Sequence, residues 1–133
     1  MWLTALYPAW ALPATPGQAL IAAVIAGGGL LVMVWAALCF RRARTTVNPM
    51  DPGQVSALVE VGPYRYSRNP MYLGDTLLLI AWAVYLGTPV NAVWVVLFTW
   101  WMHRFQIPHE ERALADSFGA AWHGYRSRVR RWL

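Results

Sequence analysis

The feature that most constrains this chain is a run of 24 residues without a charged side chain, from residue 17 to residue 40. About 20 consecutive apolar residues are enough to cross the hydrocarbon core of a bilayer as a helix, so this run predicts a transmembrane helix. Its three consecutive glycines, Gly27, Gly28 and Gly29, are tolerable there, because small residues let a neighbouring helix approach closely. The predicted helix ends at a group of arginines, residues 41, 42 and 44.

A second apolar stretch covers residues 71–106 and is interrupted by Gly-Thr-Pro at 87–89. A single helix is not expected to continue through that tripeptide, so we predict two helices, 71–86 and 90–106, joined by a tight turn. At about 1.5 Å per residue each covers about 24 Å, slightly less than the roughly 30 Å hydrocarbon core. This transmembrane hairpin therefore needs interfacial side chains or local thinning of the bilayer at its ends.

Two polar segments flank the hairpin. Residues 45–70 are rich in proline and glycine, which favours a structured loop over a continuous helix. Residues 108–133 begin with Pro108 and carry Glu110 and Glu111 in the first predicted turn, as is typical of a helix N-terminus. Apolar or aromatic residues then recur at helical spacing, which predicts one amphipathic helix lying on the membrane or on the loop. These residues are Leu114, Phe118, Trp122, Tyr125 and Val129.

The arginines predict how the chain is oriented. There are eleven arginines and no lysine, and all eleven fall in the two polar segments or directly beside them. Since arginine-rich segments stay on the cytoplasmic side, we predict that the polar loop and residues 108–133 are cytoplasmic and that the N-terminus is outside. The surplus of positive charge next to apolar segments favours contact with anionic lipid over nucleic acid. The proline-broken residues 1–16 are expected to lie at the interface or to insert partly.

These observations predict an all-α integral membrane protein of one domain, 1–133. It comprises an N-terminal segment with the first transmembrane helix (1–44) and a core of loop, hairpin and amphipathic helix (45–133). The expected location is the bacterial inner membrane. The lone Cys39 lies in an apolar run and is expected to be a small buried side chain. His103, His109 and His123 match no common zinc spacing, so we predict no metal site.

Two stretches, GPYRYSRNPMYLG at 62–74 and HEERALADSFGAAWHGYRSRVRRW at 109–132, carry a family resemblance. In this order and separated by an apolar hairpin, they resemble the isoprenylcysteine carboxyl methyltransferase and phospholipid methyltransferase family. The resemblance covers about residues 45–133. The chain departs from the family pattern at Asn69, where relatives have a histidine, and it has one clear N-terminal helix where relatives often have more. The matching positions are Gly62, Tyr64, Arg68, Pro70, Tyr72, Gly74, Glu110, Glu111, Leu114, Phe118, Gly119, Trp122 and Tyr125.

The resemblance implies transfer of a methyl group from S-adenosylmethionine to a lipophilic, membrane-associated acceptor. It implies that Arg68 and Glu111 are catalytic, with Glu111 orienting the acceptor or receiving its proton. Glu110 would hold the cofactor's ammonium or ribose hydroxyls. The remaining cofactor-binding residues would be Tyr64, Asn69, Pro70, Tyr72 and Leu73. Substrate-binding residues would be Tyr125, Arg126 and Arg128, whose alternative role is packing and contact with lipid phosphates.

Two other functions stay open from the sequence. A membrane reductase with a related core would bind NADPH instead of S-adenosylmethionine. A membrane scaffold or lipid-binding subunit would bind neither. The acceptor nucleophile, a carboxylate, an amine or a thiol, is not identified by any motif, and neither is the oligomeric state.

Overall fold

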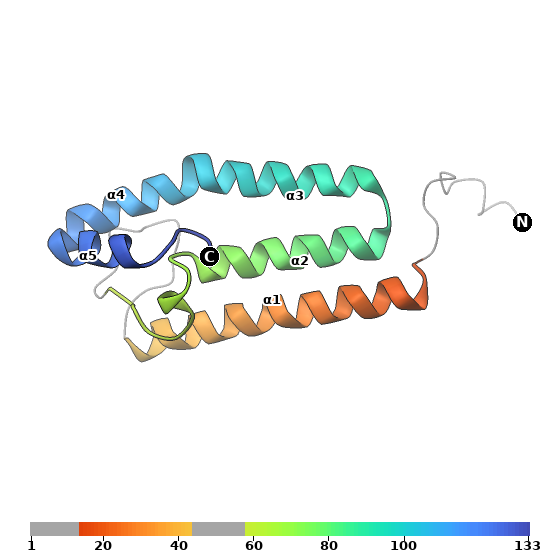
Figure 1. The fold of residues 1–133 in the computed structure, drawn as a ribbon, viewed down its shortest axis with the longest axis horizontal. Coiled ribbons are helices and arrows are strands. Elements are labelled where there is room, and N and C mark those ends of the chain that lie inside the picture. Colours follow the sequence, from red (N-terminus) through yellow and green to blue (C-terminus); the bar gives the residue numbers. More distant parts are fainter. Residues whose placement is uncertain (1–13, 44–57) are drawn as a thin grey trace, which may run out of the picture.

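The computed structural model describes residues 14–43 and 58–133, and within them every regular element is a helix (Figure 1). The predictions for residues 1–13 and 44–57 lie outside the described residues. In chain order, the elements are α1 (Pro16–Arg42), the 3₁₀ turn η3 (Gly62–Arg65), α2 (Pro70–Leu86), α3 (Pro89–Trp101), the π-helical turn η4 (Met102–Gln106), α4 (Ile107–Phe118) and α5 (Ala120–Arg128).

Helix α1 confirms the predicted long apolar helix. Its start is set by a capping box, in which Gln18 N donates to Thr15 Oγ1 at 3.2 Å and Thr15 N donates to Gln18 Oε1 at 2.8 Å. Its 27 residues extend over about 40 Å. Within the described ranges it is the one helix long and apolar enough to cross a membrane.

Helix α1 packs along α2 with the two backbones almost in contact. A Cβ atom added at Gly29 would lie 2.9 Å from the carbonyl oxygen of Gly74, and one added at Gly74 would lie 2.8 Å from the carbonyl oxygen of Gly29. Gly27 and Gly28 face open space instead. Of the glycine triplet, therefore, only Gly29 serves the close approach that was expected of small residues.

Helices α2 and α3 run antiparallel and are joined by a tight turn (Figure 1). Gly87 ends α2 in the left-handed conformation, at φ 66°, and its N–H donates to the carbonyls of Ala83 and Val84. Pro89 then starts α3 at a position where a missing N–H costs no helical hydrogen bond. Pro and Gly at these places explain why the sequence located the turn correctly.

Helix α3 differs from expectation at its end, because it runs through η4 into α4 without a break (Figure 1). The sequence placed a new helix start at Pro108. Proline has no N–H and its ring clashes with the carbonyl four residues earlier. The π turn accommodates it: the N–H of Ile107 donates to the carbonyl of Met102, five residues back, and the residues around it keep helical dihedral angles.

The prediction of one helix over 108–133 is wrong. Helix α4 ends at Phe118, and Gly119 adopts φ 51° and ψ −117°, a conformation that is costly for any residue with a Cβ. Helix α5 follows in a new direction and ends at Arg128, after which residues 129–133 are irregular and begin with an extended Val129. The apolar stripe is divided by this break, and its members Trp122 and Tyr125 are buried in α5.

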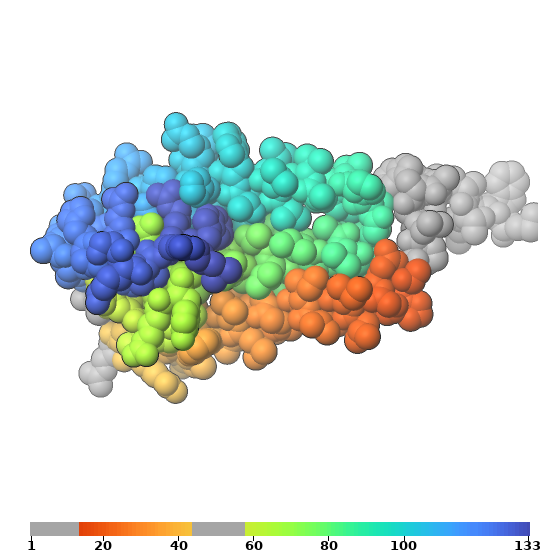
Figure 2. All heavy atoms as spheres, in the orientation of Figure 1, coloured from red at the N-terminus to blue at the C-terminus, as the bar shows by residue number. Residues whose placement is uncertain are grey.

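The segments that carry the arginines gather at one end of the bundle. Figure 1 places the end of α1, residues 58–69, α4 and α5 there, opposite the α2–α3 turn, and Figure 2 shows α5 and the residues after it packed over residues 58–69. A small core fixes the loop on α1, in which buried Cys39, as predicted, contacts Val59 and Tyr64. Gly62, at φ 62°, passes over α1 so closely that an added Cβ would lie 2.7 Å from Cys39 Sγ.

Candidate active site

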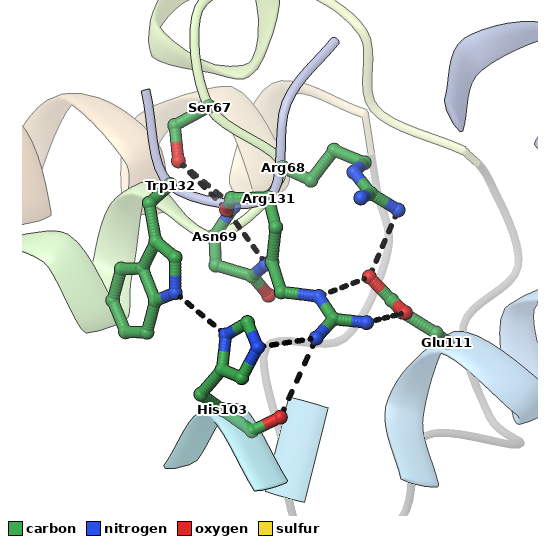
Figure 3. Close-up of polar contacts among 7 residues, drawn as sticks. All are labelled: Ser67, Arg68, Asn69, His103, Glu111, Arg131 and Trp132. Carbon is green, nitrogen blue, oxygen red and sulfur yellow. Dashed lines mark hydrogen bonds and ion pairs between the residues drawn. The ribbon is translucent and has the colours of Figure 1, made fainter. Parts of the chain in front are cut away.

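The centre of the polar end is a buried carboxylate held by two guanidinium groups (Figure 3). Glu111, on α4, has a side chain only 10% exposed. Arg131 grips it with two hydrogen bonds, Nε to Oε1 at 3.1 Å and Nη2 to Oε2 at 2.6 Å. Arg68 Nη1 lies 2.8 Å from the same Oε1. Three segments far apart in the sequence therefore meet at one carboxylate.

The segment after α5 returns to the loop to make this arrangement possible (Figure 3). The backbone N–H of Arg68 donates to the carbonyl of Arg130 at 2.9 Å. The carbonyl of Arg131 accepts hydrogen bonds from Asn69 Nδ2 at 3.0 Å and from Ser67 Oγ at 3.4 Å. Asn69, at the position of the family histidine, thus holds the backbone of residues 129–133.

The charge of Arg68 is paired, but its hydrogen-bond donors are not all used within the described residues. Its side chain is also 10% exposed. Its Nε has no hydrogen-bond partner among the described residues, and its Nη1 is close to Glu111 without an aligned N–H. Burial lowers the pKa of the guanidinium, opposed by the neighbouring Glu111, yet an arginine stays charged at any physiological pH. Two guanidinium groups against one carboxylate leave the cluster with one excess positive charge.

Trp122 lies under Arg68, with the guanidinium carbon 5.7 Å from the centre of its ring. This aromatic face stabilises the cation, since the ring quadrupole is negative above its plane. The indole Nε1 is buried and has no partner within the described part of the chain. The loop side of the cluster therefore carries two buried N–H groups, Arg68 Nε and Trp122 Nε1, that suit an acceptor oxygen.

Glu110 has surroundings quite unlike those of its neighbour. The Tyr72 hydroxyl, from the first turn of α2, and Gln106 Nε2, from η4, both donate to its Oε1, the latter at 2.9 Å. Adjacent residues on a helix point about 100° apart, which takes the two carboxylates to different partners. Both hydrogen bonds end on Oε1 of Glu110, and among the described residues Oε2 has no hydrogen-bond donor.

His103, in η4, ties the π turn to residues 129–133 (Figure 3). Trp132 Nε1 donates to His103 Nδ1 at 3.1 Å. Arg131 Nη1 lies 3.3 Å from His103 Nε2 and donates to the His103 carbonyl at 3.4 Å. His103 thus contacts two residues of the segment after α5.

Two tyrosines join α5 to the loop. The Tyr125 hydroxyl donates to the carbonyl of Tyr64 at 2.8 Å, in a buried position. Burial is the main cause that raises the pKa of both phenols, so they stay neutral in the working range of a protein. This contact places α5 on the loop, which was one of the two positions expected for the amphipathic segment.

Comparison with known proteins identifies the group to which this fold and site belong. A family model described as phospholipid methyltransferase matches residues 17–121, which is most of the chain. The chain belongs to the phospholipid methyltransferase family. Membership confirms the resemblance read from the sequence and makes the chain a membrane protein of a methyltransferase group. The match includes α1, so the family region begins earlier than the residues 45–133 of the resemblance, and it ends before Trp122.

Part of the chain is also similar to one protein of Haemophilus influenzae. An uncharacterized protein of Haemophilus influenzae is 40% identical over 63 residues, which are 47% of this chain and 100% of that protein. No solved structure matches the chain.

The structure brings together part of the residue set expected from the family resemblance. Arg68 and Glu111 form the buried ion pair, and Tyr72 reaches Glu110. Pro70 and Leu73 lie in the first turn of α2, buried and half-buried, and Tyr64 is part of the core on α1.

The expected substrate residues lie apart from the carboxylates, on α5. Tyr125 is buried with its hydroxyl engaged, whereas Arg126 is exposed. Arg128 pairs with Glu60 at 3.1 Å on the rim of an open pocket of about 360 Å³, also lined by Arg65.

Sequence reasoning missed Arg131, His103 and Trp132. Arg131 belongs to a run of basic residues that resembles a solvated helix face, and nothing local marks it as the partner of a buried carboxylate. The available signal was indirect: a buried carboxylate needs cations to pair with it, but the sequence does not say which arginines supply them.

Proposed function

We propose that this protein is an S-adenosylmethionine-dependent methyltransferase that acts on a lipophilic acceptor at the polar end of its helix bundle. The observation that carries the proposal is a buried guanidinium beside a second carboxylate, Glu110. Among residues 14–43 and 58–133, neither Arg68 Nε nor Glu110 Oε2 has a hydrogen-bond partner. A buried cation beside a separate carboxylate complements a zwitterionic ligand, and the amino-acid part of this cofactor is one.

The chain's own groups fit that cofactor. Arg68 would bind its carboxylate, using the N–H groups that Glu111 leaves free, and Glu110 would hold its ammonium or ribose hydroxyls. Tyr72 would orient Glu110, while Tyr64, Asn69, Pro70 and Leu73 would shape the cavity around it. The bound cofactor would supply a methyl group already activated by its sulfonium. The protein's part is then to align the acceptor and exclude water, so no metal is required.

The proposed role of Glu111 follows from its contacts. Both of its oxygens lie against guanidinium groups, so both are already engaged as ion-pair and hydrogen-bond acceptors. We therefore assign Glu111 to holding Arg68 in place beside the reacting groups. Any proton released by the acceptor would pass more easily to Glu110, whose Oε2 has no donor among the described residues, or to water.

The acceptor would reach the site from the membrane. The exposed apolar side chains of α1 and α3, such as Leu31 and Val96, suit contact with lipid. With the arginine-rich end on the cytoplasmic side, the cofactor would enter from water and the acceptor laterally. The exposed Arg126, and Arg128 at the rim of the surface pocket, are placed to contact an acceptor head group or lipid phosphate.

Titration calorimetry in detergent tests the proposal. S-adenosylmethionine should bind and NADPH should not. Arg68→Gln should weaken binding by about tenfold or more, since hydrogen bonds between charged groups are the strong ones. Arg65→Gln is the matched control, because it removes the same charge from an exposed site three residues away. Absence of heat with S-adenosylmethionine at high concentration would refute the proposal, and binding of NADPH alone would favour a reductase.

A second experiment identifies the acceptor. The protein is incubated with methyl-labelled cofactor and total membrane lipid, and the labelled product is analysed by mass spectrometry. The expected result is a methylated lipid whose formation is lost in Arg68→Gln and kept in Arg112→Gln, a control that removes the same charge from an exposed arginine bonded to the Pro108 carbonyl of its own helix. If the cofactor binds but label enters no lipid, the lipophilic acceptor is the part of the proposal that fails.

A further inference from the structure

We propose that Arg131 is a positioning residue, which occupies Glu111 so that Arg68 stays free to bind the anionic end of the cofactor. The inference rests on the proposed function, because it assumes that Arg68 binds the cofactor carboxylate. It concerns a residue outside the region matched by the family model. Two guanidinium groups, those of Arg68 and Arg131, contact the one buried carboxylate of Glu111, and only Arg131 makes hydrogen bonds to it.

Arg131 makes the stronger of the two contacts with Glu111. Its Nε and Nη2 reach the two different oxygens of Glu111, at 3.1 Å and 2.6 Å, which is the bidentate geometry in which arginine binds a carboxylate best. Arg68 is left beside one oxygen, without an aligned hydrogen bond and with an unpartnered Nε. Arg68 is thus held close to Glu111 by charge, while its Nε and Nη1 donors make no hydrogen bond with the described residues.

Without Arg131 this division would not hold. Glu111 would keep its charge and have Arg68 as its nearest cation. The buried guanidinium would rotate to take both oxygens, because a buried charge is stable only when it is fully paired. The N–H groups needed for a ligand carboxylate would then be used up inside the protein, and the excess positive charge of the cluster would be lost.

The position of Arg131 is itself defined by the loop that carries Arg68. The carbonyl of Arg131 accepts from Asn69 Nδ2, the carbonyl of Arg130 accepts from the Arg68 N–H, and Trp132 binds the side chain of His103. These hydrogen bonds between residues 68–69 and residues 130–131 hold the two arginines in a fixed position relative to each other. This also gives Asn69 a task that needs a hydrogen-bond donor and no titration.

The test compares two ligands that differ in the amino-acid part. S-adenosylhomocysteine carries the carboxylate and the ammonium, and 5′-methylthioadenosine lacks both. Affinities for both are measured by calorimetry on the full chain in detergent. The variants are Arg131→Gln and its control Arg130→Gln, which removes the same charge from an exposed neighbour that makes only a backbone contact.

Arg131→Gln should weaken the binding of S-adenosylhomocysteine by about tenfold or more, because only this ligand needs Arg68. The affinity for 5′-methylthioadenosine should stay within about twofold of the wild-type value. Arg130→Gln should change neither. In the double variant with Arg68→Gln the losses should not add, since Arg131 acts through Arg68. An Arg131→Lys protein should fall between wild type and Arg131→Gln, because lysine keeps the charge but gives Glu111 a single contact point.

Two results would overturn the inference. Equal weakening of the binding of both ligands in Arg131→Gln would mean that the residue merely supports the fold. Arg131→Lys keeps the buried charge paired, so it allows the same comparison in a folded protein. Unchanged binding of S-adenosylhomocysteine would mean that Arg68 does not depend on Arg131. Failure of the wild-type protein to bind either ligand would instead refute the proposed function and the inference with it.

Discussion

Replacing Gly29 by alanine should loosen the packing of α1 on α2. The added Cβ would lie 2.9 Å from the Gly74 carbonyl oxygen and 3.0 Å from Leu77 Cβ. Comfortable contacts between such atoms are about 3.5–4.0 Å, so one helix must move by about 0.5–1 Å. The nearest atom belongs to a helix backbone and cannot rotate away, unlike the end of a flexible side chain.

Overpacking of this kind typically costs about 1–3 kcal/mol, which corresponds to a factor of about 5–150 in the unfolding equilibrium constant. The control is Gly28→Ala, whose Cβ would meet nothing within 4 Å. Alanine relieves the entropic cost of a helical glycine, so this variant should be unchanged or more stable by up to about 1 kcal/mol. The two neighbouring substitutions are therefore expected to have opposite signs.

The assay is unfolding in mixed detergent micelles with increasing dodecyl sulfate, followed by tryptophan fluorescence, for which the chain has nine tryptophans. The transition midpoints give the difference in free energy of unfolding if the transition is two-state. Equal midpoints for the two variants would refute the reasoning, because they would mean that α1 and α2 do not touch at Gly29.

Three further predictions concern the polar end. Gly119→Ala should lower stability by about 1–3 kcal/mol, because alanine is strained at φ 51° and ψ −117°, and a thermal melt in detergent measures it. Tyr125→Phe leaves the buried carbonyl of Tyr64 without its donor and should cost about 1–3 kcal/mol in the same melt, whereas an unchanged midpoint would mean that water replaces the hydroxyl. Glu111→Ala leaves two guanidinium groups unpaired and should cost about 3–5 kcal/mol, and a melting temperature equal to that of wild type would contradict a buried ion pair.

The helices were predictable because their signals are local. The uncharged run 17–40 became α1 with two residues added at its C-terminal end and one at its start, and residues 71–86 became α2 with one residue added. Proline starts α1, α2 and α3, and glycine ends α2. Both signals depend only on backbone chemistry, which the sequence states directly. The break at Gly119 was missed because a single glycine inside a helical pattern is usually tolerated.

The site was predictable only in part, for a physical reason. The resemblance placed the loop arginine and the adjacent glutamates in one site, and Arg68 does contact one of them. Which glutamate it meets depends on how α4 is rotated about its axis, and that rotation depends on tertiary packing, such as the complete burial of Ile107. The contribution of Arg131 depends on a chain reversal after α5, and no local pattern encodes which carboxylate a distant arginine will reach.

The unbroken passage from α3 through η4 to α4 joins the site directly to the apolar helix α3. No loop separates Trp101, among exposed apolar residues, from Glu111, so one continuous helix carries both. If α3 lies in the bilayer, as proposed, its tilt depends on the thickness of that bilayer. A change of tilt at that end would move the carboxylates at the other end, with the π turn between them. Lipid composition would then affect the geometry of the site through the backbone, before any acceptor molecule arrives.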